Sequence, residues 1–334
     1  MSVPAIVAAG DLRAAKAIYG ESKAYLEIAG VSLVARTVAT LQAVPEVGEV
    51  WVVGNADRLR GVLGHEALVS SLRKPLHVVP QFRNLYENGW QTFRRLLPGA
   101  GPDGRDPEPP DADTAVLYLP VDIPFATPEE ISAFVRQSLA ARCDYALGLV
   151  TEESMRGFYP SAPGAPGIRL AYFNLREGRY RQSNLHLIRP ARIRNRHYID
   201  EMYEHRHQRE FGQIIGLAWR LLRSERGGVG VLWYFLLMHL AGLTDRWGLT
   251  FVADALRRMI PTARIERGVS ALLGGSYRLI VTEGGGCAAD IDTEADLDAA
   301  RRCFDVWGKA QRERAARLYG ALPSPSAGSR EPPS

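Results

Sequence analysis

The sequence predicts an α/β fold, a three-layer α/β/α arrangement in which helices cover both faces of a mainly parallel sheet. Short apolar runs of strand length alternate with segments of helical periodicity over the first 150 residues. This alternation is typical of parallel strands joined by helices. With 334 residues, 46% of them apolar, the chain can bury one large core of this kind. We therefore expect a single domain over residues 1–320 and a disordered, Pro- and Ser-rich tail at 321–334.

Most of the sheet is expected to come from residues 1–150, the first half of this domain. Short apolar runs predict buried strands, and apolar residues that recur every three or four positions predict helices. The predicted strands cover 6–9, 49–54, 76–79, 116–121 and 145–151, and the predicted helices cover 31–41, 86–97 and 128–141. A stretch rich in Pro, Gly and Asp at 98–113 predicts a mobile surface loop.

The pattern changes in residues 151–280, where we expect a β-hairpin and a helical insertion. Two extended runs, 168–175 and 180–188, flank Arg176-Glu177-Gly178-Arg179 and predict the hairpin. The predicted helices of this region cover 199–223 and 250–259, and a further strand covers 279–282. Residues 281–320 are expected to close the domain with an acidic motif and a helix over 296–318.

The first predicted strand ends in Ala8-Ala9-Gly10, where the absence of a Cβ on glycine lets the backbone approach a ligand. Backbone N–H groups after such a turn suit phosphate oxygens, and nearby positive charge favours the same ligand. The basic residues that follow the turn are Arg13, Lys16 and Lys23. The sequence therefore predicts a nucleotide-phosphate site in which either Arg13 or Lys16 takes the loop position.

Three motifs occur in a fixed order along the chain. They are Ala8-Ala9-Gly10 with Lys23, the strand-end segment 116–125 with Asp122, and the acidic segment 290–297 with Asp292. Together they resemble the motifs of the MobA-like NTP transferase superfamily, the GT-A-type nucleotidyltransferases. The resemblance implies a Rossmann-like (GT-A) sheet and an enzyme that transfers NMP from an NTP to a phosphorylated acceptor. It also implies that Lys23 neutralises the α-phosphate and that Arg13 contacts the leaving pyrophosphate.

Nucleotidyl transfer brings two anions together, so positioning and charge neutralisation are the main catalytic tasks. A divalent cation with oxygen ligands performs them, and we expect Mg²⁺, or Mn²⁺, to be bound by Asp122 and Asp292. Both lie beside predicted strand ends, where open α/β sheets bind ligands. The alternatives are a strand-end turn for Asp122 and a helix N-cap for Asp292, and Asp290 is a weaker metal candidate.

The two substrates are assigned to separate segments. Residues 80–92 occupy the position at which the family reads the nucleobase, and Asn88 and Gly89 are the expected contacts. Acceptor contacts are expected at Asn184, on the second run of the hairpin, and at Arg189, in the basic cluster that follows. The alternative for residues 80–92 is a plain helix start. The alternatives for Asn184 and Arg189 are an ordinary edge strand and a solvated helix face.

Residues 189–243 combine a cluster of Arg and His with an apolar run at 229–243. The run is too short to span a bilayer, which takes about 20 apolar residues. It predicts a core helix, a homodimer interface or, together with the basic cluster, peripheral contact with a membrane surface.

Composition excludes several other classes of protein. A formal net charge of +4 does not imply a nucleic-acid surface, and three widely spaced cysteines predict neither a disulfide framework nor a zinc site. The N-terminal residues show no secretory signal, so we expect a cytoplasmic protein.

We therefore expect a magnesium-dependent nucleotidyltransferase whose ligands are an NTP and a phosphorylated sugar, alcohol or cofactor precursor. A GT-A glycosyltransferase that uses a nucleotide sugar is one alternative, and a catalytically silent nucleotide-binding module is another. The sequence leaves the choice of base and acceptor open.

Overall fold

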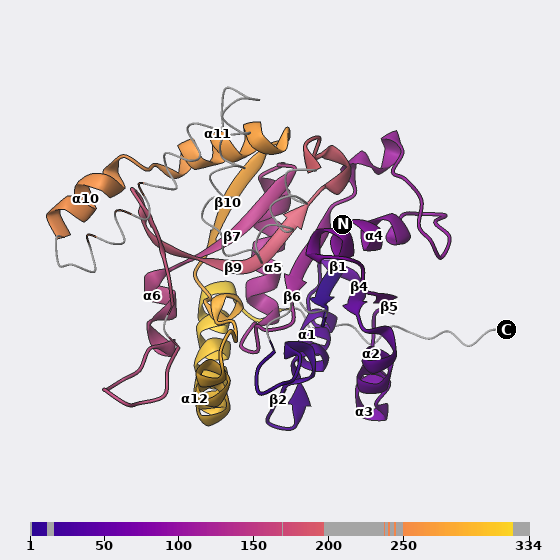
Figure 1. Ribbon diagram of the computed structural model, residues 1–334, viewed down its shortest axis with the longest axis horizontal. Coiled ribbons are helices and arrows are strands. Elements are labelled where there is room, and N and C mark those ends of the chain that lie inside the picture. Colours follow the sequence, from indigo (N-terminus) through magenta and orange to yellow (C-terminus); the bar gives the residue numbers. More distant parts are fainter. Residues whose placement is uncertain are drawn as a thin grey trace.

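The computed structural model describes residues 2–11, 17–168, 170–196 and 250–322, and the single positions 237, 240 and 244. Within these residues, an eight-stranded sheet has the order β10-β7-β9-β6-β1-β4-β5, and β8 pairs with β9. Helices lie on both faces of this sheet (Figure 1). The predicted α/β fold with a mostly parallel sheet is confirmed.

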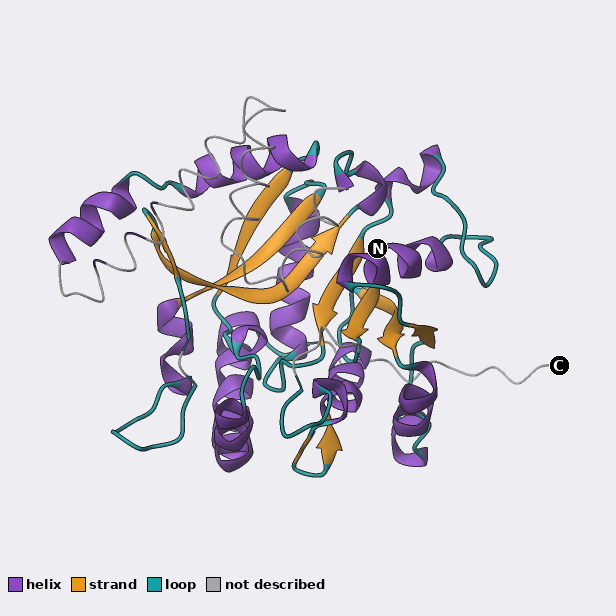
Figure 2. Cartoon of the chain, viewed as in Figure 1, coloured by secondary structure: helices purple, strands orange, loops and turns teal. Residues whose placement is uncertain are grey.

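Figure 2 distinguishes the helices and strands by colour. The strands of the sheet are β1 (Val3–Ala9), β4 (Val47–Gly54), β5 (Leu76–Pro80), β6 (Val116–Pro120), β7 (Tyr145–Thr151), β8 (Phe173–Leu175), β9 (Gly178–Ile188) and β10 (Tyr277–Thr282). A separate small hairpin consists of β2 (Glu27–Ile28) and β3 (Val31–Ser32). The helices are α1 (Leu33–Gln42), α2 (Ala56–Leu63), α3 (Glu66–Val69), α4 (Leu85–Leu96), α5 (Pro128–Ala140), α6 (Glu152–Met155), α10 (Thr250–Arg258), α11 (Thr262–Leu273) and α12 (Glu294–Tyr319). The sequence did not predict α2, α3, α6 or α11.

Strand β9 lies in the middle of the sheet and runs antiparallel to its neighbours. It lies between β6 and β7 and runs opposite to both, so the long arm of the predicted hairpin is inserted into the main sheet. Arg181, near its start, pairs with Val150 at the carboxyl end of β7, whereas Ile188 pairs with Val116 at the amino end of β6. The two ends of β9 therefore lie at opposite edges of the sheet.

Both faces of the sheet are buried, which explains the nearly continuous apolar strands of the sequence. Val50 and Val52 of β4 face the core formed with α1, α2 and α5. Trp51 and Val53, which alternate with them, face the core formed with α4. Side chains alternate between faces along a strand, so both sets must be apolar.

The segment predicted to be a mobile loop, 98–113, contacts the domain where the Arg105 N–H donates a 3.1 Å hydrogen bond to the carbonyl of Arg94 on α4, and it also has contacts within itself. Arg105 donates two hydrogen bonds, of 2.7 and 2.9 Å, to the two carboxylate oxygens of Asp111. Asp111 belongs to a short 3₁₀ turn, η2 (Pro109–Asp113), and is buried. This paired fork fixes the loop more firmly than its composition suggests.

Several expectations fall on positions outside the described residues. These are the helix at 199–223, nearly all of the apolar run at 229–243, and residues 323–334 of the tail. Within the run, Leu237 is buried against Leu175 and Ile260, and Leu240 is 40% exposed. Among the described residues, no helix is long and apolar enough to cross a bilayer.

His186 of β9 is a partly buried titratable group in the sheet. The Tyr145 hydroxyl lies 2.7 Å from its Nδ1, and the Gln182 amide nitrogen lies 3.3 Å from its Nε2. Burial lowers the pKa of His186 to about 4. The neutral imidazole is thus the form that the fold accommodates.

We expect His186→Gln to weaken the pH dependence of the free energy of unfolding. Between pH 4 and 6.5 the unfolded chain binds the proton that the folded chain excludes, so folded stability rises with pH by about 3 kcal/mol through this residue. Urea unfolding of wild type and variant at several pH values in this window measures the difference. Exposed His65→Gln is the control and should keep the wild-type slope; parallel curves for wild type and His186→Gln would contradict the prediction.

Three consecutive glycines, Gly284-Gly285-Gly286, pass through a crowded region before α12. A Cβ on Gly286 would lie 2.0 Å from the backbone oxygen of Phe125, and one on Gly284 would lie 2.3 Å from the Glu130 carboxyl carbon. Gly285 has a φ of +100°, which L side chains rarely adopt. The chain can pass here only without side chains.

We expect Gly286→Ala to lower the free energy of unfolding by about 1–3 kcal/mol, because the new methyl group overpacks the site. Gly61 of α2 is the matched control, since a Cβ there would meet nothing within 4 Å. Gly61→Ala should raise stability by about 0.5–1 kcal/mol, as expected for an exposed helix position. Urea denaturation compares the two, and equal effects would show that the crowding at Gly286 is relieved by local movement.

Candidate active site

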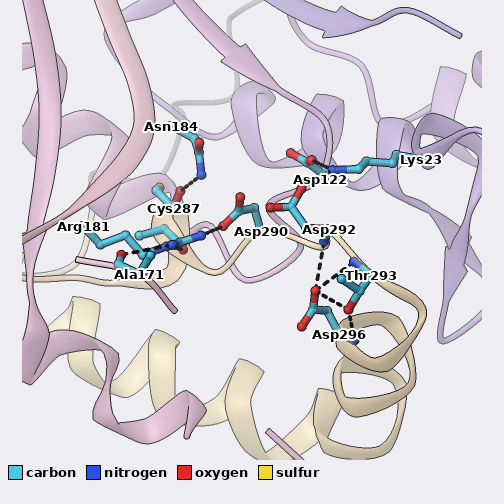
Figure 3. A network of polar contacts seen from close by, with 11 residues as sticks. Lys23, Asp122, Ala171, Arg181, Asn184, Cys287, Asp290, Asp292, Thr293 and Asp296 are labelled. Carbon is cyan, nitrogen blue, oxygen red and sulfur yellow. Dashed lines mark hydrogen bonds and ion pairs between the residues drawn. The ribbon is translucent and has the colours of Figure 1, made fainter. Parts of the chain in front are cut away.

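Lys23, Asp122 and Asp292 are far apart in the sequence and meet at the carboxyl edge of the sheet (Figure 3). The Lys23 ammonium nitrogen lies 2.5 Å from Asp122 Oδ2 and 2.7 Å from Asp292 Oδ1. Lys23 begins a 3₁₀ turn, η1 (Lys23–Tyr25), that follows the loop after β1. Asp122 follows β6, and Asp292 precedes α12.

Backbone contacts hold the two carboxylates in register. The Ile291 N–H donates a 2.9 Å hydrogen bond to the carbonyl of Asp122, which joins the two segments. Thr293 is the N-cap of α12 and forms a capping box with Asp296. Thr293, and not Asp292, is therefore the N-cap residue of this helix, and the Asp292 carboxylate faces Lys23.

The three groups have coupled electrostatics. Burial raises the pKa of Asp122 above its usual range, although the Lys23 charge acts in the opposite direction. Burial also acts to raise the pKa of Asp292, but the hydrogen bond and charge of Lys23 outweigh it and lower that pKa. Burial acts to lower the pKa of Lys23, and the two carboxylates outweigh it and raise that pKa. Lys23 therefore remains an ammonium group at neutral pH.

A second cluster lies beside the first, on the β9 side. Arg181 forms an ion pair with Asp290 and donates a 2.8 Å hydrogen bond to the carbonyl of Ala288. Burial raises the pKa of Asp290, against the effect of Arg181. Asn184 donates a 3.3 Å hydrogen bond from its side chain to the carbonyl of Cys287. Arg181 was not among the site residues predicted from the sequence, although it lies in the same run as Asn184.

A bulge in β9 places Asn184 at this edge. The register with β7 shifts between Leu147 and Leu149, and Asn184 has a φ of +58°. Such bulges redirect side chains. Arg189 lies instead at the opposite end of β9, where its guanidinium donates to the carbonyl of Cys143. The structure thus brings Asn184 close to the acidic segment and leaves Arg189 at the other edge of the sheet.

Glu130, on α5, positions the turn that leads to the acidic segment. Its fully buried carboxylate accepts hydrogen bonds of 2.9 and 3.1 Å from the backbone N–H groups of Gly285 and Cys287. These residues border or belong to the 3₁₀ turn η5 (Gly286–Ala288). Burial raises the pKa of Glu130, and the backbone donors act to lower it. The sequence could have indicated this role, because Glu130 lies next to Ile131 in a predicted helix, and a charged residue among apolar ones is unusual unless it has partners.

The end of β1 forms the other side of the site. Ala8 and Ala9 are its last residues, and the Gly10 that follows is flanked by two side-chain amides. A Cβ on Gly10 would lie 3.4 Å from both Asn88 Nδ2 and Gln81 Oε1. Asn88 is buried and accepts a 2.5 Å hydrogen bond from the N–H of Phe82. Gln81, which directly follows β5, was missed although the same strand-end argument applies to it.

Asp11 carries a negative charge beside this turn, and its side chain has partners. Gln81 accepts from the Asp11 N–H at 2.9 Å and donates to the Asp11 carboxylate at 2.7 Å. Arg58 lies 3.6 Å from the same carboxylate. These contacts neutralise Asp11 locally. Arg13 and Lys16 lie outside the described residues, so the choice between them stays a prediction.

Gly89 follows Asn88 on α4 and lies over the Tyr118 ring. A Cβ at Gly89 would be 3.5 Å from that ring, an ordinary contact, so packing does not by itself require glycine there.

The donor set suits a hard divalent cation. In the part of the chain that the structure describes, no group of three or more His, Cys, Asp or Glu side chains could hold a metal ion. Asp122 and Asp292 nevertheless converge on one positive group, as ligands of a single cation do. Mg²⁺ is commonly held by one or two carboxylates plus substrate phosphates and water. The residues present fit that requirement.

Residues 5–155 match the family described as the MobA-like NTP transferase domain. This part of the chain contains Lys23 and Asp122, whereas Asp292 and the β9 side of the site lie beyond it. The resemblance predicted from the motifs is confirmed for residues 5–155, the part of the chain that matches this family.

Two known proteins illustrate the similarity. A 2-C-methyl-D-erythritol 4-phosphate cytidylyltransferase of Chlorobium luteolum (strain DSM 273 / BCRC 81028 / 2530) is 29% identical over 120 residues, which are 36% of this chain and 47% of the relative. The chain thus spans about half the length of this curated relative. A solved structure described as a hypothetical transferase from Thermus thermophilus has a TM-score of 0.60 at 22% identity. The alignment covers 89% of this chain and 100% of that chain, and the likeness is one of fold.

Proposed function

We propose that this protein is a magnesium-dependent nucleotidyltransferase that moves NMP from an NTP to a phosphorylated small-molecule acceptor. The observation that carries the proposal is the Lys23 ammonium held between Asp122 and Asp292 in a MobA-like domain. The relative's name describes cytidylyl transfer to a phosphorylated polyol, which supports CTP and phosphorylated polyols as the first substrates to test.

The nucleotide would lie over the end of β1. Ala8 and Ala9 end the paired part of β1 with small side chains, Gly10 leaves the backbone after them uncovered, and the Asn88 and Gln81 amides beside Gly10 offer hydrogen bonds to the base or ribose. Gly89 would allow a flat ring to approach α4. Arg13 or Lys16 would contact the β- and γ-phosphates that leave as pyrophosphate.

The reaction forms one bond and breaks one bond at the α-phosphorus. An oxygen of the acceptor's phosphate attacks this atom, and the bond to the pyrophosphate oxygen breaks. Phosphate is already anionic, so the attack needs no general base. Lys23 moves from the carboxylates to the α-phosphate and neutralises the charge that grows there. A magnesium ion held by Asp122 and Asp292 would neutralise the phosphates of both reactants.

The acceptor would lie on the β9 side of the site. Asn184 can contact a hydroxyl or phosphate oxygen, and Arg181 keeps the neighbouring acidic segment in place through Asp290 and Ala288. Arg189 lies at the far end of β9, so we do not include it in the proposed acceptor site.

Pyrophosphate release tests the reaction class. Each of the four NTPs is incubated with Mg²⁺ and a panel of phosphorylated polyols, sugars and amino-alcohols. The nucleoside diphosphate-linked product is identified by ³¹P NMR. Acceptor-dependent pyrophosphate is the expected result. Transfer of a sugar from a nucleotide sugar without pyrophosphate would replace the proposal with a glycosyltransferase.

We expect Lys23→Ala to lower kcat and kcat/KM together by about 10²–10³-fold, as for the loss of one preorganised charge-stabilising donor. Affinity for the NTP should change less, because the β1 turn and magnesium still hold the other phosphates. Lys23→Arg should restore activity only in part, since a planar guanidinium does not replace a compact ammonium. Exposed Lys309→Ala is the control; wild-type turnover by Lys23→Ala would remove the assignment.

We expect Asp122→Asn and Asp292→Asn each to lower turnover by about 100-fold or more, comparable with other losses of charge stabilisation. Each should also weaken Mn²⁺ binding, measured by EPR on the enzyme with a non-hydrolysable NTP. Asp57→Asn, at a side chain 96% exposed, is the matched control. Unchanged Mn²⁺ affinity in both site variants, or full activity in EDTA, would show that these carboxylates hold no metal.

A further inference from the structure

A basic cavity lies on the surface formed by α10, α11 and the turn between β8 and β9. Its volume is about 490 Å³, and four arginines line it: Arg176, Arg258, Arg264 and Arg267. Met259 and Pro261 lie among them, and the lining contains no acidic side chain. A neighbouring cavity of about 280 Å³ shares Arg176 and Arg258 and adds Arg179 and Arg257. We call this surface the arginine face.

Apolar side chains are exposed beside these arginines. Phe251 is 83% exposed and Met259 is 49% exposed. Phe251, Ala255 and Arg258 are four and three residues apart, so they lie on one side of α10, and the last two are exposed as well. Leu256, which points the other way, packs against the core with Leu175 and Ile260. The outer side of α10 is thus both apolar and basic.

The acidic side chains that the structure describes on these elements already have partners, and Glu177, which lines the neighbouring cavity, pairs with an arginine of the arginine face itself. Glu266 of α11 accepts from the Leu279 N–H at 2.9 Å and pairs with Arg278 at 2.8 Å. Glu177 accepts from the Thr262 N–H at 3.0 Å and pairs with Arg176 at 3.1 Å. The sequence of α10 also contains Asp254. Positive charge therefore exceeds negative charge on the arginine face.

The basic cluster that begins at Arg189 is described only as far as Arg196, so the expected membrane contact through 189–243 stays a prediction. Its described arginines bind within the domain: Arg192 pairs with Asp113, Arg194 donates to the carbonyl of Gly274, and Arg196 stacks over Trp90. The remaining positions of 197–243, apart from 237 and 240, lie outside the described residues. Among the residues that the structure describes, α10 and α11 carry the arginine face, and they extend along one edge of the molecule (Figure 1).

We propose that the arginine face docks on an anionic phospholipid surface, with its guanidinium groups on lipid phosphates and Phe251 and Met259 at the headgroup–acyl boundary. Guanidinium groups bind phosphate oxygens in a bidentate manner. Soluble phosphates and nucleic acids would use the arginines but leave exposed apolar side chains without a role. Basic and apolar residues on one helix side are typical of interfacial binding. The proposal is independent of the catalytic reaction.

Vesicle cosedimentation tests it, with the full-length protein and no nucleotide present. The vesicles contain phosphatidylcholine alone or with 30% phosphatidylglycerol. Wild type should partition onto the anionic vesicles and not onto the neutral ones. Arg264→Gln with Arg267→Gln should weaken partitioning about 25-fold, at about fivefold for each arginine near a charged surface. Phe251→Ser should weaken it about tenfold, through lost apolar burial.

Matched substitutions elsewhere separate docking from general charge and hydrophobicity. Arg60→Gln with Arg156→Gln changes exposed arginines on other elements, and Val306→Ser changes an apolar side chain of α12 that is 71% exposed. Both controls should bind as wild type does, and circular dichroism should show that every variant is folded. Absence of binding that depends on phosphatidylglycerol would overturn the proposal. Equal losses in the controls, or wild-type binding by Phe251→Ser, would also overturn it, the latter in favour of a purely ionic surface.

Discussion

The contact of one ammonium group with two carboxylates is the interaction around which this site is arranged. Asp122 is nearly buried, and its carboxylate and that of Asp292 approach within hydrogen-bond distance of the same nitrogen. Without Lys23, the nearly buried Asp122 carboxylate would face the more exposed Asp292 carboxylate with no opposite charge beside it, which is costly for the buried member of the pair. Lys23 therefore fills the role that a cation would have. If a metal joins the carboxylates, Lys23 becomes available for a phosphate, so metal and nucleotide are expected to enter together.

The arrangement depends on a rigid turn behind it. Glu130 accepts backbone hydrogen bonds from residues of the Gly284–Cys287 stretch, and the glycines there let the chain pass against Phe125 and α5. The Ile291 N–H then joins this segment to Asp122. A buried carboxylate is costly unless its oxygens are bonded, and here the backbone supplies the donors. The same hydrogen bonds fix the direction in which the chain enters the acidic segment.

The three ordered motifs selected Lys23, Asp122 and Asp292, and the structure brings these side chains together, while their roles in binding and catalysis stay predictions. Asp122 follows β6, at the edge of the sheet where strand ends meet, whatever the order of the strands. The sequence was not sufficient for β9. Periodicity identifies an extended run but not the neighbours with which it pairs, and those are chosen by contacts between distant residues. The direction of β9 decides which end of the run reaches the site. For this reason Arg181 and Asn184 lie near the acidic segment, whereas Arg189 lies at the opposite edge.

The same strand gives the molecule a physical connection between two surfaces. The β8–β9 turn contributes Arg176 and Arg179 to the cavities of the arginine face, and Arg181 and Asn184 follow a few residues later at the acidic segment. Residues 178–180 of β9 pair with β8 and residues 180–182 pair with β7, so this short stretch is a rigid spacer. A phosphorylated group bound at one end would therefore have a defined position relative to the other end.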